Sequence, residues 1–158
     1  MRMIILDHNS ECHEYLLTDF HKDEVSVGRD PSRCDIVINA PFVSGRHIVV
    51  KKCENEVYFY DDNSTNGTIL DNNGYQTLVK QDYTARKILP GTMLRIQPSG
   101  SHGAHNSVLI LFADNLQNGD WSRIAVKEGK ITPVKNMNTL KLLIANDGNP
   151  KTGSETGV

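Results

Sequence analysis

Two short apolar runs separated by a polar break limit the fold of this chain more than any other feature. His47–Val50 and Val57–Tyr60 are rich in β-branched and aromatic residues, so each is predicted to be a β-strand. Glu54–Glu56 is predicted to be the turn between them, which makes the pair an antiparallel hairpin. Because a hairpin returns to the edge at which it began, we expect the polar segments before and after it to lie together.

Short strand signals continue on both sides of this hairpin. Apolar runs separated by Gly, Pro, Asn and Asp predict strands at Met1–Leu6, Tyr15–Thr18, Val25–Val27, Ile36–Ile38, Met93–Ile96 and Val108–Phe112. The last run is apolar throughout, so we place it centrally in a sheet. Residues 71–74 are a strong turn signal, and residues 75–87 are polar enough for a hairpin or a long loop. Strands this closely spaced predict an all-β, antiparallel sandwich of about ten to eleven short strands.

Length and composition predict one domain. A chain of 158 residues, 38% hydrophobic and 23% charged, is long enough for one well-buried core and short for two. We assign the sandwich to residues 1–113 and a C-terminal extension to residues 114–146. In the extension, residues 121–126 and 130–134 could form a hairpin that packs on the sandwich. Residues 147–158 are predicted to be a disordered tail.

Net charge and cysteine usage limit the classes of binding partner and the cellular compartment that we expect. The net charge of −2 gives no general attraction to nucleic acid or to an anionic membrane, so an anion site must supply its own positive charge. Cys12, Cys34 and Cys53 are odd in number and widely spaced, which favours reduced thiols over a disulfide framework or a zinc site. The apolar run Met3–Leu6 is far too short for a signal peptide or a membrane span. We therefore expect a cytoplasmic protein that binds no nucleic acid.

Catalytic and cofactor motifs are weak in this sequence. Ser44 and His47 could suggest a hydrolase, but there is no G-x-S-x-G elbow. His102 and His105 lie in a Gly-rich segment without nearby carboxylate or thiol ligands, so we expect no metal site there. No P-loop and no dinucleotide-binding motif occurs. The sequence predicts neither an enzyme nor a cofactor.

Three short polar motifs follow one another between the predicted strands: Gly28-Arg29, Ser44-x-x-His47 and Ser64-Thr65-Asn66-Gly67-Thr68. In this order and spacing they resemble the forkhead-associated (FHA) domain, a β-sandwich family that recognises phosphothreonine peptides. Each motif alone is weak evidence, but the three together on an all-β background are specific. The resemblance covers about residues 1 to 113. It implies a phosphothreonine-containing partner, namely a Ser/Thr kinase or its substrate.

The chemistry of phosphothreonine explains why these residue types would form its site. The side chain carries roughly −1.5 to −2 charges and calls for a guanidinium fork with hydroxyl or backbone donors. Arg29 can supply the fork, and Ser44 and Thr65 can supply hydroxyls. Asn66 suits a peptide main chain, because its amide both donates and accepts. The resemblance implies the same four roles.

Gly45 departs from the family pattern. The residue directly after the pocket serine is usually a basic or amide side chain that helps to bind phosphate, and here it is glycine. Arg46 could turn inward in its place or point outward along the strand. The backbone N–H of Gly45 could also help to form an anion-binding nest. We therefore expect a working but weaker phosphate pocket.

The remaining site residues have structural or selective roles. Gly28 and Gly67 are predicted to be turn glycines, and the resemblance implies that His47 is an internal hydrogen-bonding brace. Phe42 occupies the position that in the family meets the third ligand residue after the phosphothreonine, which predicts Leu, Ile, Val or Met there. The alternative is that Phe42 folds inward under its loop as a core residue.

Two functions remain open from the sequence. The first is a phosphothreonine-dependent peptide-binding module for protein–protein interaction in kinase-linked signalling or secretion regulation. The second is a phospho-independent interaction domain with a vestigial phosphate pocket, which would bind through a sheet face or through the segment after Asp114. Gly45 favours the second function, and the coupled motifs favour the first.

Overall fold

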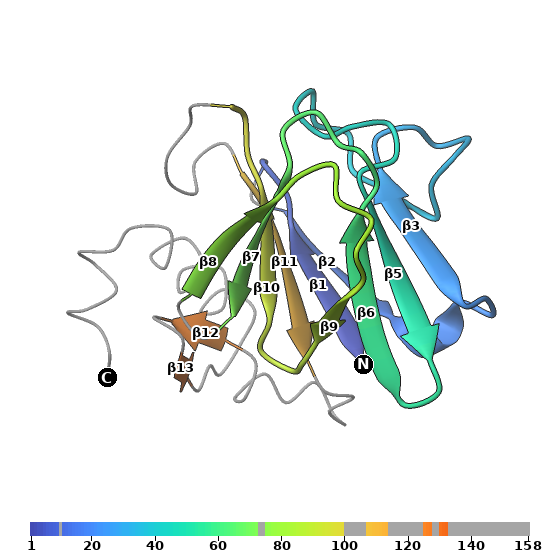
Figure 1. Cartoon of the computed structure of the whole chain (residues 1–158), viewed down its shortest axis with the longest axis vertical. Helices are drawn as coiled ribbons and strands as arrows, with labels where there is room; N and C mark the ends of the chain where they lie inside the picture. The colour runs from blue at the N-terminus through green and yellow to red at the C-terminus, as the bar shows by residue number, and fades with distance from the viewer. Residues whose placement is uncertain (10, 73–74, 100–106, 114–124, 128–129, 133–158) are drawn as a thin grey trace.

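The computed structural model describes residues 1–9, 11–72, 75–99, 107–113, 125–127 and 130–132. In the described residues up to 113 the chain forms two β-sheets that pack face to face (Figure 1), and the two short segments after them pair as a third, two-stranded sheet. The helical segment among them is a single 3-10 turn, Leu17–Asp19 (η1). The all-β sandwich predicted from the sequence is confirmed.

The larger sheet has six strands in the order β2-β1-β11-β10-β7-β8, and all its pairs are antiparallel. The strands are Arg2–Leu6 (β1), Cys12–Leu16 (β2), Thr68–Asn72 (β7), Tyr75–Val79 (β8), Met93–Ile96 (β10) and Val108–Ala113 (β11). β11 is buried along its whole length and lies between β1 and β10, as its uninterrupted apolar run predicted.

The smaller sheet has five strands in the order β4-β3-β5-β6-β9. The strands are Glu24–Gly28 (β3), Ile36–Val37 (β4), Ile48–Cys53 (β5), Glu56–Asp61 (β6) and Arg86–Ile88 (β9). β5 and β6 form the predicted hairpin, and its turn is one residue shorter than expected because Glu56 already pairs with Cys53. β3 and β4 run parallel, unlike the other strand pairs of the described chain.

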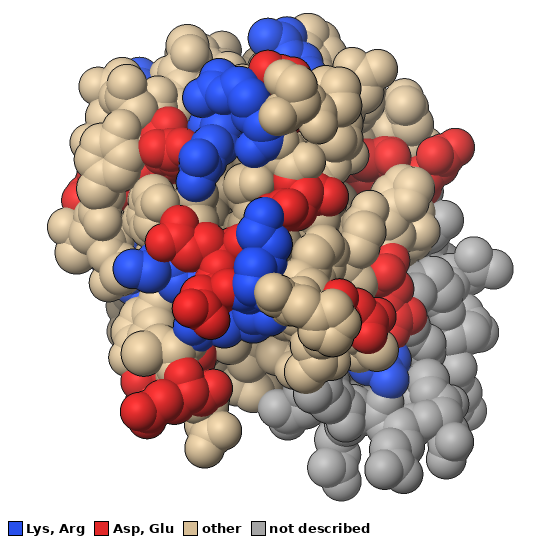
Figure 2. All heavy atoms as spheres, turned by 90° about the vertical axis from the view of Figure 1, so that its right-hand side faces the viewer, with Lys and Arg blue, Asp and Glu red and all other residues tan. Residues whose placement is uncertain are grey.

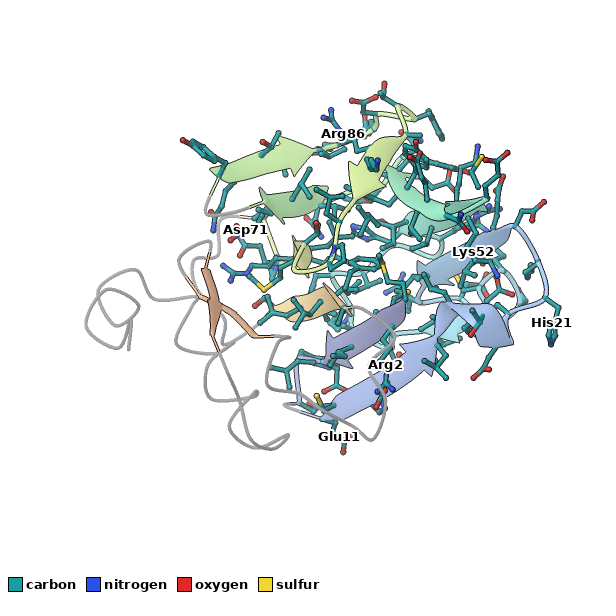
Figure 3. All side chains as sticks on the ribbon, turned by 90° about the horizontal axis from the view of Figure 1, so that it is seen from below. Arg2, Glu11, His21, Lys52, Asp71 and Arg86 are labelled. Carbon is teal, nitrogen blue, oxygen red and sulfur yellow. The ribbon has the colours of Figure 1, made fainter. Side chains whose placement is uncertain are left out.

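The hydrophobic core fills the space between the two sheets, where the side chains of facing strands meet (Figure 3). Along β6 the side chains alternate between the core and the outer face: Val57 and Phe59 are buried in the core, while Tyr58 and Tyr60, which alternate with them, are half-buried. Complete burial of a side chain of this size stabilises a fold by about 1.5–3 kcal/mol. The packed sheets therefore form a stable scaffold for the loops that connect their strands.

Strand assignments differ from the sequence prediction in three places. The strand expected at Tyr15–Thr18 is β2, which ends at Leu16 and is followed by η1. Asp71 and Asn72 were predicted to be part of a turn, but they belong to β7. Residues 75–87 form neither a hairpin nor one long loop, because β8 pairs with β7 and β9 pairs with β6. This segment therefore crosses from one sheet to the other.

The sequence indicated a hairpin in the C-terminal extension, and two short strands pair there. Ala125–Lys127 (β12) runs antiparallel to Lys130–Thr132 (β13). The expected packing of this hairpin and the tail at 147–158 stay predictions, and the tail, His102 and His105 lie outside the described residues. Within the described part of the chain, no helix is long and apolar enough to cross a membrane.

Candidate functional site

Three loops meet at one end of the sandwich, at the top of Figure 1. They are residues 29–35 between β3 and β4, residues 38–47 between β4 and β5, and residues 62–67 between β6 and β7. A hollow of about 370 Å³ opens among them. Its lining is formed by Arg29, Arg33, Ser44, Gly45, Arg46, Asp62, Asn63, Thr65 and Tyr83.

Ser44 and Thr65 lie side by side, as the geometry of the hairpin predicted. The backbone N–H of Thr65 donates to Ser44 Oγ at 3.0 Å. This bond uses a lone pair of Ser44 Oγ, so the hydroxyl hydrogen stays available for a bound anion. The Thr65 side chain is exposed, and its hydroxyl makes no hydrogen bond within the described chain. Both hydroxyls can therefore donate to a ligand in the hollow.

Arg29 lines the same hollow and is tied to the pocket serine. Its backbone N–H donates to the Ser44 carbonyl at 2.9 Å. Its guanidinium is exposed and makes one hydrogen bond in the described chain, from Nη1 to the Pro41 carbonyl at 3.3 Å. Since a guanidinium carries five N–H donors, most of the Arg29 fork is free to bind an anion.

Arg46 also lines the hollow, but two carboxylates lie close to its guanidinium and balance its positive charge. Its Nε lies 3.1 Å from Asp62 Oδ2, and its Nη2 lies 4.0 Å from Glu24 Oε1. On the side of the molecule that Figure 2 turns toward the viewer, Lys and Arg side chains stand next to Asp and Glu side chains. Of the orientations that the sequence left open, Arg46 adopts one at the rim that faces these acidic partners, so it is less available to a ligand than Arg29.

Asn66 joins two of the loops. Its Nδ2 donates to the Phe42 carbonyl at 2.9 Å, which leaves its Oδ1 without a hydrogen bond in the described chain. The Phe42 ring is partly buried against the core and meets the His8 ring edge to face, with centroids 6.0 Å apart. This position agrees with the inward alternative for Phe42. Preference for an apolar third ligand residue stays a prediction.

His47 braces the loops from within the fold. The ring is fully buried. Its Nδ1 accepts from the Ser44 backbone N–H at 3.0 Å, so the Nε2–H donates to the Gly67 carbonyl at 2.9 Å. Burial lowers the pKa of His47, against the opposing effects of the Gly67 carbonyl and the Asp61 carboxylate. The neutral ring thus links the loop of Ser44 to the loop of Gly67.

Acid is expected to destabilise the protein through His47. Because the pKa of His47 is lower in the folded chain than the ordinary value of 6.5, the unfolded chain binds the proton first. The stability that the neutral His47 ring contributes is complete above about pH 6.5, and it is lost as the pH falls toward the pKa of His47 in the folded chain. A proton on Nδ1 also removes the acceptor of the Ser44 N–H. NMR titration of the His47 ring checks this, and a pKa at or above 6.5 would contradict a buried neutral brace.

A buried carboxylate that the sequence reasoning missed organises the third loop. Asp61 ends β6 and is fully buried. It accepts hydrogen bonds from the Ser64 N–H at 2.9 Å, the Ser64 hydroxyl at 2.6 Å, the Thr68 hydroxyl at 2.9 Å and the Gln81 N–H at 3.1 Å. Ser64 Oγ in turn accepts from the Gly67 N–H at 2.9 Å. An Asp at the start of a polar turn is a known turn-forming signal, and this signal could have indicated Asp61.

Two glycines shape the site in different ways. Gly67 has φ +78°, a conformation that favours glycine, in agreement with its predicted place in a turn. Gly28 is not a turn glycine, because it is the last residue of β3. A Cβ on Gly28 would lie 2.5 Å from the Gly45 carbonyl oxygen, closer than real Cβ atoms approach. Gly28 therefore allows the strand and the pocket loop to approach closely.

Comparison with known proteins finds a matching family model and several solved structures of similar fold. Residues 25–97 match the family model described as the FHA domain. No curated protein sequence matches the chain at a significant level.

Several solved structures share the fold. The FHA domain of the CT664 protein from Chlamydia trachomatis is 23% identical, with a TM-score of 0.52 over 73% of this chain and 100% of that chain. The N-terminal FHA domain of S. cerevisiae Rad53p, solved with a phosphothreonine peptide, is 16% identical, with a TM-score of 0.51 over 73% and 95%. Full-length yeast Pml1p is 19% identical, with a TM-score of 0.53 over 69% and 77%. At these identities the likeness shows the fold alone.

Proposed function

We propose that the chain is an FHA domain that acts as a phosphothreonine-dependent peptide-binding module for protein–protein interaction, on the premise that residues 25–97 match the FHA family model. One observation carries the proposal. The guanidinium of Arg29 and the hydroxyls of Ser44 and Thr65 line one hollow, and their donors are largely unused within the described chain. The related Rad53p domain was solved with a phosphothreonine peptide, which supports the same class of ligand here.

The proposed chemistry matches each group to a part of the ligand. Arg29 binds two phosphate oxygens through parallel N–H donors, and Ser44 and Thr65 donate their hydroxyls to the same phosphate. The free Oδ1 of Asn66 accepts a backbone N–H of the peptide. This role is binding, without a catalytic step.

Partner and location follow from the same ligand chemistry. A phosphothreonine is made by a Ser/Thr kinase, so we propose that the partner is such a kinase or its substrate, in signalling or secretion regulation. Cys12, Cys34 and Cys53 all carry free thiols, which supports a reducing compartment such as the cytoplasm.

Paired peptide libraries test the proposal. A degenerate phosphothreonine library should bind to the protein, and the same library without phosphate should not. The alternative function, a phospho-independent domain with a vestigial pocket, predicts no difference between the libraries. Equal signals from the two libraries would therefore overturn the proposal in favour of that alternative.

Phosphothreonine is expected to bind more tightly than phosphoserine. The FHA mode of binding places the γ-methyl in a small apolar niche beside the phosphate, and one buried methyl is worth about 0.8 kcal/mol, or roughly fourfold in affinity. The restricted rotamers of a β-branched side chain add to this preference. Calorimetry on the best-bound library peptide and its phosphoserine twin measures the ratio. Equal affinities would count against this mode of binding.

A further inference from the structure

Arg33 is a second guanidinium at the hollow that the motifs did not reveal. It lies in the same loop as Arg29, is exposed, and lines the hollow together with Arg29 and Ser44. Its side chain makes no hydrogen bond or ion pair within the described chain, and only a longer-range attraction links it to Asp30. Arg46, by contrast, faces Asp62 at 3.1 Å. Arg29 and Arg33 thus form no ion pair with a carboxylate in the described chain.

The Arg33 guanidinium lies against the place where a side chain at position 45 would begin. A Cβ on Gly45 would lie 3.1 Å from Arg33 Nη1 and 3.7 Å from Asp30 Cβ, and these are its nearest contacts. The backbone of Gly45 lies outside the left-handed region, so its conformation does not require glycine. The contact with Arg33 is the feature of this site that a larger residue would disturb.

Backbone and thiol contacts hold the loop segment that carries Arg33. The Arg33 N–H donates to the Asp30 carbonyl at 3.1 Å, and the Arg33 carbonyl lies 3.2 Å from Ser26 Oγ in β3. The next residue, Cys34, donates its thiol to the Gly45 carbonyl at 2.9 Å. Burial raises the pKa of the Cys34 thiol, so the thiol keeps the proton that it donates. These bonds fix the backbone at Arg33, from which its exposed side chain reaches the hollow.

We propose that Arg33 is the second phosphate-binding guanidinium of this site and replaces the basic side chain that position 45 lacks. The inference rests on the proposed function, because its ligand is the phosphate of the same peptide. Arg29 and Arg33 bind the phosphate dianion, while Ser44 and Thr65 donate hydroxyls to it. Gly45 is then no defect of the pocket, since a side chain there would crowd Arg33 Nη1.

A variant pair tests the replacement directly. The best-bound library peptide is titrated against the wild-type chain, Arg33→Ala and the double variant Arg33→Ala/Gly45→Arg. Arg33→Ala should bind about tenfold more weakly or worse, because a charge-assisted hydrogen bond is lost. The double variant should recover affinity, because its new guanidinium enters the space that Arg33 leaves. Lys87→Ala removes an equal charge on β9, where Lys87 pairs with Glu56 at 3.0 Å, and should bind like wild type.

Salt titration separates a phosphate contact from a structural role. Loss of a direct contact to phosphate should make the affinity of Arg33→Ala less dependent on salt, with an unchanged melting temperature. Unchanged affinity in Arg33→Ala, beside a wild-type chain that binds, would overturn this inference and leave the proposed function standing. A wild-type chain that binds no phosphothreonine peptide would overturn both. Weak binding in the double variant, equal to that of Arg33→Ala, would overturn the replacement of position 45.

Discussion

The Arg29→Ala protein is expected to fold normally and to lose phosphopeptide binding. The Arg29 side chain is exposed, and its hydrogen bond to the Pro41 carbonyl is long, at 3.3 Å. Its backbone bond to Ser44 is kept in alanine. Losing one partner of a desolvated charge pair costs about 2–5 kcal/mol. A micromolar complex has about −8 kcal/mol in total, so Kd should rise by about thirtyfold to several thousandfold.

Calorimetry with the best-bound phosphothreonine peptide measures this loss, and thermal unfolding checks the fold. Arg29→Lys is the sharper companion, because it keeps the charge and removes the planar fork; we expect it to bind more weakly than wild type. Lys87→Ala controls for the change in net charge. An Arg29→Ala protein that is folded and binds with wild-type affinity would show that the phosphate lies elsewhere.

The hairpin that carries the site could be predicted because its signals are local. β5 and β6 are rich in β-branched and aromatic residues, and a two-residue turn fixes their register. A hairpin brings its own ends together, so the topology predicts that Ser44 and Thr65 lie close, and the hydrogen bond between them confirms it. The three motifs then placed Arg29 at the same end through the resemblance to the FHA domain.

Edge strands and loop paths could not be predicted in the same way. β2 and β8 lie at the edges of the larger sheet and leave most of their side chains at least partly exposed, so neither carries a clear pattern of burial. The loop that brings Arg33 to Gly45 is held by the bond of the Arg33 carbonyl to Ser26 in β3 and by the bond of Cys34 to the Gly45 carbonyl in the next loop, and no sequence motif marks either bond. A local reading of Gly45 therefore indicated a missing charge and could not show that another loop brings one.

Asp61→Ala is expected to cause a large loss of stability, and the reason lies in the donors that surround the carboxylate. Asp61 is fully buried and accepts four hydrogen bonds, from Ser64, Thr68 and Gln81. Alanine would leave these donors without their acceptor, which should lower the free energy of unfolding by about 3–5 kcal/mol. The same hydrogen bonds hold the loop that carries Thr65, so peptide binding should weaken when they are lost.

Two matched variants decide whether the network is the cause. Asp61→Asn keeps one acceptor oxygen, and the hydroxyls of Ser64 and Thr68 can rotate to accept from its amide, so its loss should be smaller. Asp62→Ala removes the neighbouring carboxylate, whose partly exposed ion pair with Arg46 is worth less than about 1 kcal/mol. Denaturant unfolding of the three variants ranks their losses in the free energy of unfolding. If Asp61→Ala lost no more stability than Asp62→Ala, the buried carboxylate would not hold this loop, and the firm placement of Thr65 would need another cause.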